Sequence, residues 1–364
     1  MYRFISRSVY IVTIFAILIC FLTGAADYNK IYGQETNSAG FYVHAHLPKN
    51  QIKSDVSYFD LLMKPSQEQK ISVEIFNEKD EDVQVEIGLN NASTNANGLL
   101  DYTRNGIKHP SMVNEFEEIA SVSPGSITVK GGGNKIVDID LKMPPERFHG
   151  DILGGIVFTE VQQTDDTNQN NTENQDENNQ RGMNIVNRIS YAVAVKLSET
   201  NKNVDPDFKL ERVAYDSVDY KKTFVNEICN TNPKLITGVE MDVEVKNSDN
   251  ETVISEKKDD ISIAPNSIMP YPITVEEPVV PGEYASHVQI RYTDSDNNKQ
   301  AVDLNKNFQV TDEQIKAVDD KIPNPGTDVF PLWAKILIPI VIALIISVIV
   351  MIVLLTRRKD RKSA

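Results

Sequence analysis

The chain has 364 residues, a formal net charge of −15 at pH 7 and hydrophobic residues at 40% of its positions. This length is enough for two domains of ordinary size, and the acidic balance opposes binding to nucleic acid or to other anionic polymers through bulk charge. The two cysteines are Cys20, inside an apolar segment near the N-terminus, and Cys229. An exported chain that loses the first could form no internal disulfide, so its stability would rest on packed cores.

The first 26 residues have the pattern of a secretory signal peptide. Arg3 and Arg7 precede an apolar run from Val9 to Leu22, and small residues follow at positions 24–26. This order of a positive region, a short apolar region and a small-residue site predicts a signal peptide over residues 1–26. An uncleaved first transmembrane helix is the alternative, and the short apolar run argues against it.

A second apolar segment lies near the C-terminal end. The run from Ile336 to Leu355 carries no charge, and a helix needs about 20 apolar residues to cross a bilayer core. Trp333 precedes the run, and a cluster of basic residues follows it. These flanks predict a transmembrane helix over 332–356 with a basic cytoplasmic tail over 357–364. The expected location is therefore the cell membrane, with a single span and the N-terminal part outside; a buried core helix is the alternative.

Alternating apolar and polar residues predict short strands from residue 38 to residue 200. Strands at Ile71–Ile75 and Val83–Leu89 flank a polar turn, which predicts a hairpin. A second hairpin is predicted where Gly131-Gly132-Gly133 separates Ile127–Val129 from Ile136–Leu141. Residues 112–120 could hold a short helix. We interpret 38–200 as a first β-sandwich domain.

One long polar segment interrupts this first domain. Residues 162–180 contain no apolar side chain and are predicted to form a disordered acidic loop. The apolar strands Ile152–Val161 and Ile185–Leu197 lie on either side, so we expect them to pair; a linker between domains is the alternative. Gly154-Gly155 in the earlier strand indicates a bulge or the close approach of another backbone.

The next segment, 205–312, is predicted to be a second antiparallel β-sandwich. Its short strands recur at regular spacing with turn residues between them. The cleanest alternation occurs at Val239–Val245 and Tyr271–Val275, which could provide a surface for a partner that adds to an edge strand; alternation does not identify which strand lies at an edge. Residues 313–331 then read as a charged stalk that contains Pro and Gly. The predicted fold class is all-β, with two consecutive sandwiches and one C-terminal transmembrane helix.

The sequence offers little that indicates catalysis. His44 and His46 lie two residues apart and would share one face of a strand, where they could ligate a metal. A structural metal site usually needs four ligands, and no further His or Cys cluster supports this pair. Ser, Asp and His occur in no catalytic-triad context. We therefore predict no catalytic residue, no metal and no cofactor, and a binding role rather than an enzyme.

Several different short motifs follow one another along the two predicted domains. They are Leu47-Pro48-Lys49-Asn50-Gln51, Tyr58-Phe59-Asp60-Leu61, Lys64-Pro65, the Asn-rich stretch 94–102, Phe148–Ile156, Asn187–Tyr191, Asn232-Pro233, Ala264-Pro265-Asn266-Ser267 and Pro281-Gly282-Glu283-Tyr284. Taken together with the two ends, this series resembles the WxL-interacting proteins of Gram-positive bacteria from about residue 40 to residue 356. Ser66, where that family usually has Gly, and the long acidic loop are departures.

The resemblance implies two immunoglobulin-like domains with different partners. The first would bind peptidoglycan, and the second would bind a WxL-domain surface protein or a host ligand. Five residues in or near the matching motifs of the first domain are candidates for glycan binding: Tyr58, Phe59, Asn97, Tyr102 and Arg188. For each of them taken singly, core packing or turn formation is the more common role.

Two other functions stay open at this point. A host-matrix adhesin or passive stalk would act without a WxL partner. An enzyme of cell-wall metabolism would be favoured by a pocket that holds His44, His46 and a third ligand.

Overall fold

The computed structural model describes residues 40–103, 106–161, 189–200 and 202–322, with isolated positions between 337 and 351. The predicted signal peptide and the acidic loop at 162–180 lie outside these residues, as do the basic tail and most of the predicted membrane helix. Within the described part of the chain, no helix combines the length and the apolar character that crossing a membrane requires.

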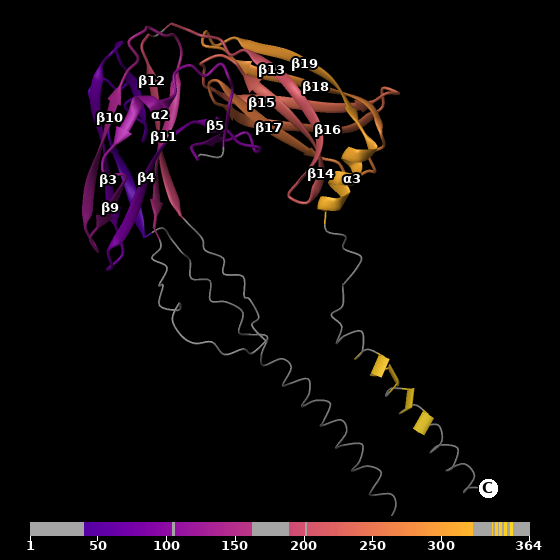
Figure 1. Ribbon diagram of the computed structural model, residues 1–364. Coiled ribbons are helices and arrows are strands. Elements are labelled where there is room, and N and C mark those ends of the chain that lie inside the picture. The colour runs from indigo at the N-terminus through magenta and orange to yellow at the C-terminus, as the bar shows by residue number, and fades with distance from the viewer. Residues whose placement is uncertain are drawn as a thin grey trace, which may run out of the picture.

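The fold is mostly β, and its sheets form two units (Figure 1). The N-terminal unit, residues 40–200, has two main sheets and a small two-stranded one. The strands of one are, in spatial order, β1 (Phe41–His46), β3 (Glu68–Asn77), β10 (Asn134–Lys142) and β8 (Ala120–Val122). The strands of the other are β2 (Phe59–Leu62), β12 (Ser190–Ser198), β11 (Ile152–Glu160), β4 (Val83–Asn91) and β9 (Ser126–Val129). All pairs are antiparallel except β2 with β12, which is parallel.

One apolar core fills the space between these two sheets. Alternate residues of β3 and β4 are buried, because a strand that faces a core on one side directs every second side chain into it. Phe41, Phe59 and Phe158 are completely buried there. Burying one such side chain stabilises the fold by roughly 1.5–3 kcal/mol.

Both predicted hairpins of this unit are wrong. The strands β3 and β4 belong to opposite sheets, as do β9 and β10. Each connecting segment crosses from one sheet to the other over the end of the core. Alternation predicted correctly which face of each strand is buried, but it does not determine which strand lies alongside.

The paired glycines of β11 have a different role from the one predicted. The register of β11 with β4 and with β12 is regular through Gly154 and Gly155, so there is no bulge. A Cβ on Gly154 would come within 2.2 Å of the Phe116 ring, and one on Gly155 within 2.6 Å of the Tyr102 ring. Phe116 begins the short helix α2 (Phe116–Ile119), which lies inside the segment expected to hold one. The glycines thus make room for aromatic rings on both faces of the strand.

The C-terminal unit, residues 202–322, also has two sheets, one of which includes the short strand β7 (Ile107–Lys108) from the N-terminal part of the chain. One contains β13 (Phe208–Val218), β14 (Lys221–Asn230), β17 (Ser267–Thr274) and β7, and the other contains β16 (Thr252–Ile263), β15 (Ile236–Asn247), β18 (Gly282–Thr293) and β19 (Lys299–Val310).

In the N-terminal unit, the predicted pairing of the strands that flank 162–180 is confirmed, since β11 runs antiparallel to β12.

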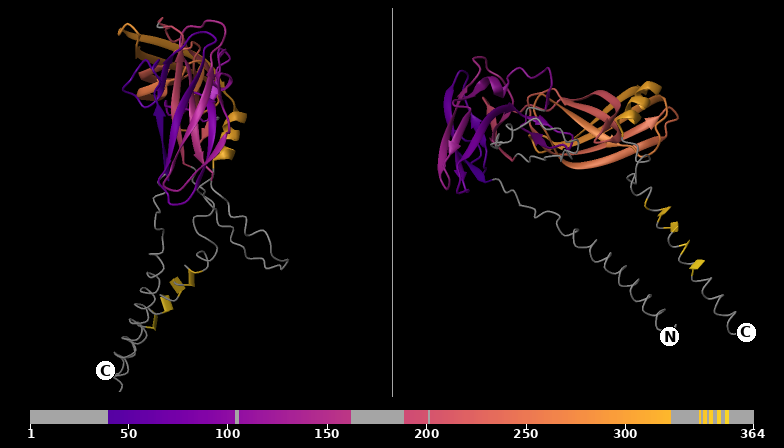
Figure 2. Two further views of the ribbon diagram at one scale, coloured as in Figure 1. Left: turned by 90° about the vertical axis from the view of Figure 1, so that its left-hand side faces the viewer. Right: turned by 60° about the horizontal axis from the view of Figure 1, so that its bottom comes forward.

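Residues 312–321, at the start of the predicted stalk, form helix α3 (Asp312–Lys321). A capping box between Thr311 and Gln314 begins the helix. Val318 is buried against the second unit, and Lys222 pairs with Asp319 at 2.6 Å. Figures 1 and 2 place α3 at the end of its unit that lies away from the N-terminal unit.

The two units meet in a hydrogen-bonded junction. The hairpin of β5 (Ser93–Thr94) and β6 (Leu100–Asp101) extends toward β16 and β17, and β7 adds directly to β17. The Ser262 N–H donates to the Gly98 carbonyl at 2.8 Å, and the Asp151 N–H donates to the Pro233 carbonyl at 2.7 Å. A small apolar cluster of Ala92, Leu153 and Ala264 fills the space between the units.

Candidate functional site

A groove of about 800 Å³ runs along the free edge of β1. Among the described residues this strand is the outermost of its sheet and pairs with β3 alone. Residues 43–46 of the strand and Leu47, which follows it, form one wall of the groove, and residues 55–58, which lead into β2, form the other. The groove therefore follows four consecutive residues of an edge strand and the residue after them.

The backbone of β1 offers unpaired polar groups to this groove. In an antiparallel pair, successive residues direct their N–H and C=O alternately toward and away from the neighbouring strand. The Glu78 N–H donates to the Gly40 carbonyl, just before β1, whereas the Asn77 N–H donates to the Gly133 carbonyl, just before β10. The even-numbered residues of β3 therefore direct their N–H and C=O groups toward β1. The register then turns the N–H and C=O of Val43 and Ala45 away from β3, toward the groove.

The side chains that line the groove are mixed: Val43, Ala45, Leu47 and Val56 are aliphatic, and the other lining side chains are polar or aromatic. His44 and His46 lie on one face of β1 with their rings 5.4 Å apart, edge to face. The His46 Nε2 lies 3.1 Å from Glu74 Oε2 on β3. Asp55 and Tyr58 on the opposite wall add a carboxylate and a phenol ring. A site with an aromatic surface and groups that donate and accept hydrogen bonds is suited to binding a polar ligand.

The predicted glycan-binding residues are not brought together as a group. Tyr58 lines the groove, and its hydroxyl is close enough to contribute to the pKa of Tyr102, which burial raises to about 12. Asn97 is exposed in the turn between β5 and β6. Phe59 is 0% exposed and belongs to the core, and Arg188 lies outside the described residues. Sequence reasoning missed Val43 and Ala45, because only the identity of the edge strand reveals their role. It also missed Asp55, which lies in the loop that forms the opposite wall.

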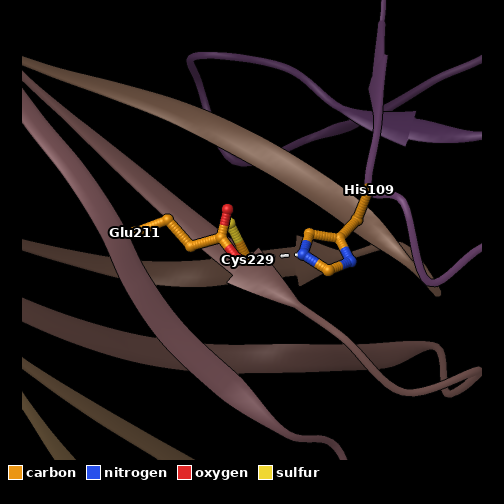
Figure 3. A group of neighbouring side chains, drawn as sticks. All are labelled: His109, Glu211 and Cys229. Atoms are coloured by element: carbon orange, nitrogen blue, oxygen red, sulfur yellow. Dashed lines mark hydrogen bonds and ion pairs between the residues drawn. The ribbon is translucent and has the colours of Figure 1, made fainter.

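A cluster of three potential ligands lies at the junction (Figure 3). His109, which follows β7, faces Glu211 on β13 and Cys229 on β14, and their ligand atoms lie within 4.8 Å of one another. The His109 Nε2 is 3.0 Å from Glu211 Oε1, and His109 Nδ1 accepts a hydrogen bond from the Ser111 N–H at 3.0 Å. The neutral ring therefore carries its proton on Nε2 and donates it to Glu211.

This protonation pattern opposes a metal in the cluster. A metal would need the Nε2 lone pair, and Nδ1 would then have to carry a proton that points at the Ser111 N–H. Burial, followed by the charge of Glu211, raises the pKa of Cys229 to about 12, so the sulfur is held as a thiol. The hydrogen bond from His109 lowers the pKa of Glu211 and keeps it a carboxylate. We interpret the cluster as a contact that joins the two units.

The two cleanly alternating segments of the second unit occupy different places in its sheets. The segment Val239–Val245, considered as a surface for strand addition, lies in β15, which is flanked by β16 and β18 and so offers no free edge to a partner. Tyr271 lies in β17, whose outer edge is partly occupied by β7. The Val275 N–H donates to the Lys222 carbonyl on β14. By the register of the two strands, the even-numbered residues of β17 therefore direct their main-chain groups away from β14, toward the outer edge. Two of these are Pro270 and Pro272, which have no N–H to offer.

Comparison with known proteins places these observations in a family. The architecture is mostly β and is built from two units. Residues 41–160 match the family model described as "WxL Interacting Protein, peptidoglycan binding domain", and residues 180–320 match "WxL Interacting Protein, host binding domain". The chain belongs to the WxL-interacting protein family. No curated protein matches it.

Several solved structures show a distant likeness. The CupB2 chaperone of Pseudomonas aeruginosa is 13% identical, with 66% of this chain and 95% of that chain covered and a TM-score of 0.28. The E. coli chaperone DraB is 11% identical, with 74% and 98% covered and a TM-score of 0.27.

Proposed function

We propose that this protein is a non-catalytic cell-surface binding protein that links peptidoglycan to a WxL-domain surface protein. The N-terminal unit would bind peptidoglycan, and the C-terminal unit would bind the WxL-domain protein, with a host ligand as a further partner. Each unit would be an immunoglobulin-like sandwich. The observation that carries the proposal is the groove at residues 43–58, which lies within the span matched by the peptidoglycan-binding family.

The geometry of the groove favours binding over cell-wall hydrolysis. His44, His46 and Asp55 all line it, yet among the described residues only the junction cluster brings three ligand atoms within 4.8 Å of one another. The His46 ring is engaged with Glu74. Ser57 also lines the groove, and nucleophilic catalysis would require a base within hydrogen-bond reach of it. We therefore assign the histidines to ligand recognition.

The sequence at the two ends completes the proposal. A signal peptide at 1–26 and a helix at 332–356 would hold both units outside the cell membrane, with residues 357–364 inside. Protease added to cells from which the wall has been removed would then digest nearly the whole chain. A protected fragment much longer than the helix and tail would contradict this topology.

Binding to peptidoglycan is tested by co-sedimentation of the full chain with purified Gram-positive sacculi. We expect Tyr58→Ala to weaken the association about tenfold, since losing an aromatic contact in a groove costs 1 kcal/mol or more. Tyr220→Ala is the matched control, because Tyr220 is 71% exposed on the other unit. Equal retention of both variants would remove the groove from the proposal, and no retention of the parent chain would remove peptidoglycan.

The linking role needs a three-component experiment. A purified WxL-domain protein is mixed with sacculi in the presence and absence of the full chain. We expect the WxL-domain protein to reach the pellet only when the full chain is present. Sedimentation that does not depend on the chain, or none in its presence, would contradict a linking role and leave the host ligand as the partner.

A further inference from the structure

We propose that the groove beside β1 binds the peptide part of peptidoglycan as an added β-strand, and that the glycan strand lies outside it. This inference rests on the proposed function and specifies which chemical part of the polymer the site recognises. It is carried by the backbone of β1, by the charges of the two groove walls and by a contrast with β17.

The backbone of β1 is prepared for another strand. Val43 and Ala45 turn their N–H and C=O toward the groove, so these pairs of groups recur about every 7 Å along it. An extended α-linked peptide segment carries the complementary N–H and C=O groups at about the same interval, and main-chain pairing of this kind is a common mode of peptide recognition. In a stem peptide such a segment begins at the diamino acid, after the γ-linked glutamyl residue, whereas a glycan strand has no such repeat. Residues 43–47 extend over roughly 15 Å, which is long enough for that short segment.

The charges on the two walls fit the ends and branches of a wall peptide. Stem peptides carry free carboxylates and, at a diamino acid, an ammonium group, whereas the N-acetylated sugars of the strand carry neither. Asp55 on one wall complements an ammonium group, and the imidazole of His44 on the other can donate a hydrogen bond to a carboxylate, whereas His46 is engaged with Glu74.

The edge of β1 also lacks the features that block pairing. Edge strands that must stay unpaired are commonly protected by proline or by a bulge. On the outward edge of β17, Pro270 and Pro272 supply this protection, and β7 covers the adjoining positions. Residues 41–46 contain no proline, and the register of β1 with β3 is continuous over the whole strand. An unprotected edge inside a groove is suited to accepting a strand.

The test uses the full chain with three preparations: intact sacculi, glycan strands freed of their peptides by an amidase, and soluble stem peptides. We expect binding to intact sacculi, loss of binding to the stripped glycan, and competition by the soluble peptides. Equal binding to intact and stripped material would refute the inference and leave peptidoglycan binding in place. No binding even to intact sacculi would refute the proposed function itself.

A matched pair of proline variants tests the backbone contact. Ala45→Pro removes one N–H that faces the groove and keeps the ladder with β3, whereas Ala301→Pro makes the same change on edge strand β19 of the other unit. The Asp294 N–H bonds to the Asn298 carbonyl in the turn before β19, and the register then directs the Ala301 N–H outward as well. Ala45→Pro should weaken binding to sacculi about tenfold and Ala301→Pro not at all.

A second variant guards against loss of folding. If thermal unfolding shows that Ala45→Pro destabilises the chain, Asp55→Asn takes its place, because Asp55 is exposed in a loop. We expect Asp55→Asn to weaken competition by a stem peptide with a free side-chain amine about tenfold, and to leave unchanged its competition when that amine is acetylated. An equal effect on both peptides would contradict the assignment of Asp55.

Discussion

The Thr94 hydroxyl oxygen in β5 accepts a hydrogen bond from the Ala264 backbone N–H at 2.8 Å, between residues that are 170 positions apart. Both residues are buried. The bond satisfies an N–H that the sheets of the second unit leave unpaired, so a side chain of the N-terminal unit completes the backbone pairing of the other. The junction is therefore part of the fold of both units.

Replacing Thr94 by valine should destabilise the protein. The substitution keeps the shape of the side chain but leaves the buried Ala264 N–H without an acceptor, which typically costs about 1–3 kcal/mol. Chemical denaturation of the full chain measures the change. Thr128→Val is the control, because Thr128 is exposed on β9, and its effect should stay within about 0.5 kcal/mol. Equal effects would contradict the role given to the junction bond.

Two glycines in neighbouring strands should respond in opposite directions to alanine. Gly154→Ala would place a methyl group within 2.2 Å of the Phe116 ring and should destabilise the chain by about 1–3 kcal/mol. Gly88→Ala meets nothing closer than 3.6 Å and should be neutral or stabilising by about 0.4–1 kcal/mol. Thermal unfolding of the two variants decides; a stable Gly154→Ala chain would show that Phe116 can move aside.

The docking of α3 should depend on pH through Asp216. The side-chain hydrogen bond from Lys321, followed by one from the Ser217 N–H, holds the pKa of Asp216 below its ordinary value of 3.8. A lowered pKa contributes stability that is fully present above pH 3.8 and is lost as the pH falls through the lower, folded-state value. Asp216→Asn should therefore unfold at a lower temperature than the parent at pH 6, with the difference shrinking below pH 3.8. A difference that persists at pH 2 would have another cause.

Removing metal should leave the junction unchanged. Since His109 Nδ1 accepts the Ser111 N–H and Cys229 is held as a thiol, neither EDTA nor added zinc should shift the unfolding temperature of the full chain. The control is Cys229→Ser, which removes the sulfur. A zinc-dependent rise in unfolding temperature that disappears in this variant would show that the cluster binds metal after all.

Some of the fold follows directly from local pattern. Strict alternation predicts strands at Ile71–Ile75 and Val239–Val245, and both are strands whose alternate residues are buried. Partner choice does not follow, because it depends on how the chain crosses the end of the core. The two residues Ile107 and Lys108 form β7 only because β17 is there to receive them. So short a segment has no periodicity of its own.

The candidate site was predictable only in part. Tyr58 stands within a motif that resembles the family, and it lines the groove. Phe59 beside it was an equal candidate by sequence, yet the alternation of β2 sends its ring into the core. Val43 and Ala45 have ordinary aliphatic side chains, and what they contribute is main-chain geometry at an edge. No residue type signals that contribution.

The pairing of β7 with β17 also bears on what happens when the two units separate. Such opening would free the outward positions of β17 near Ser267 and Ile268, while Pro270 and Pro272 would still interrupt the remainder of that edge. The newly exposed template would be too short to recruit a strand from a second molecule. A population of opened molecules should therefore reclose rather than exchange strands or aggregate along this edge.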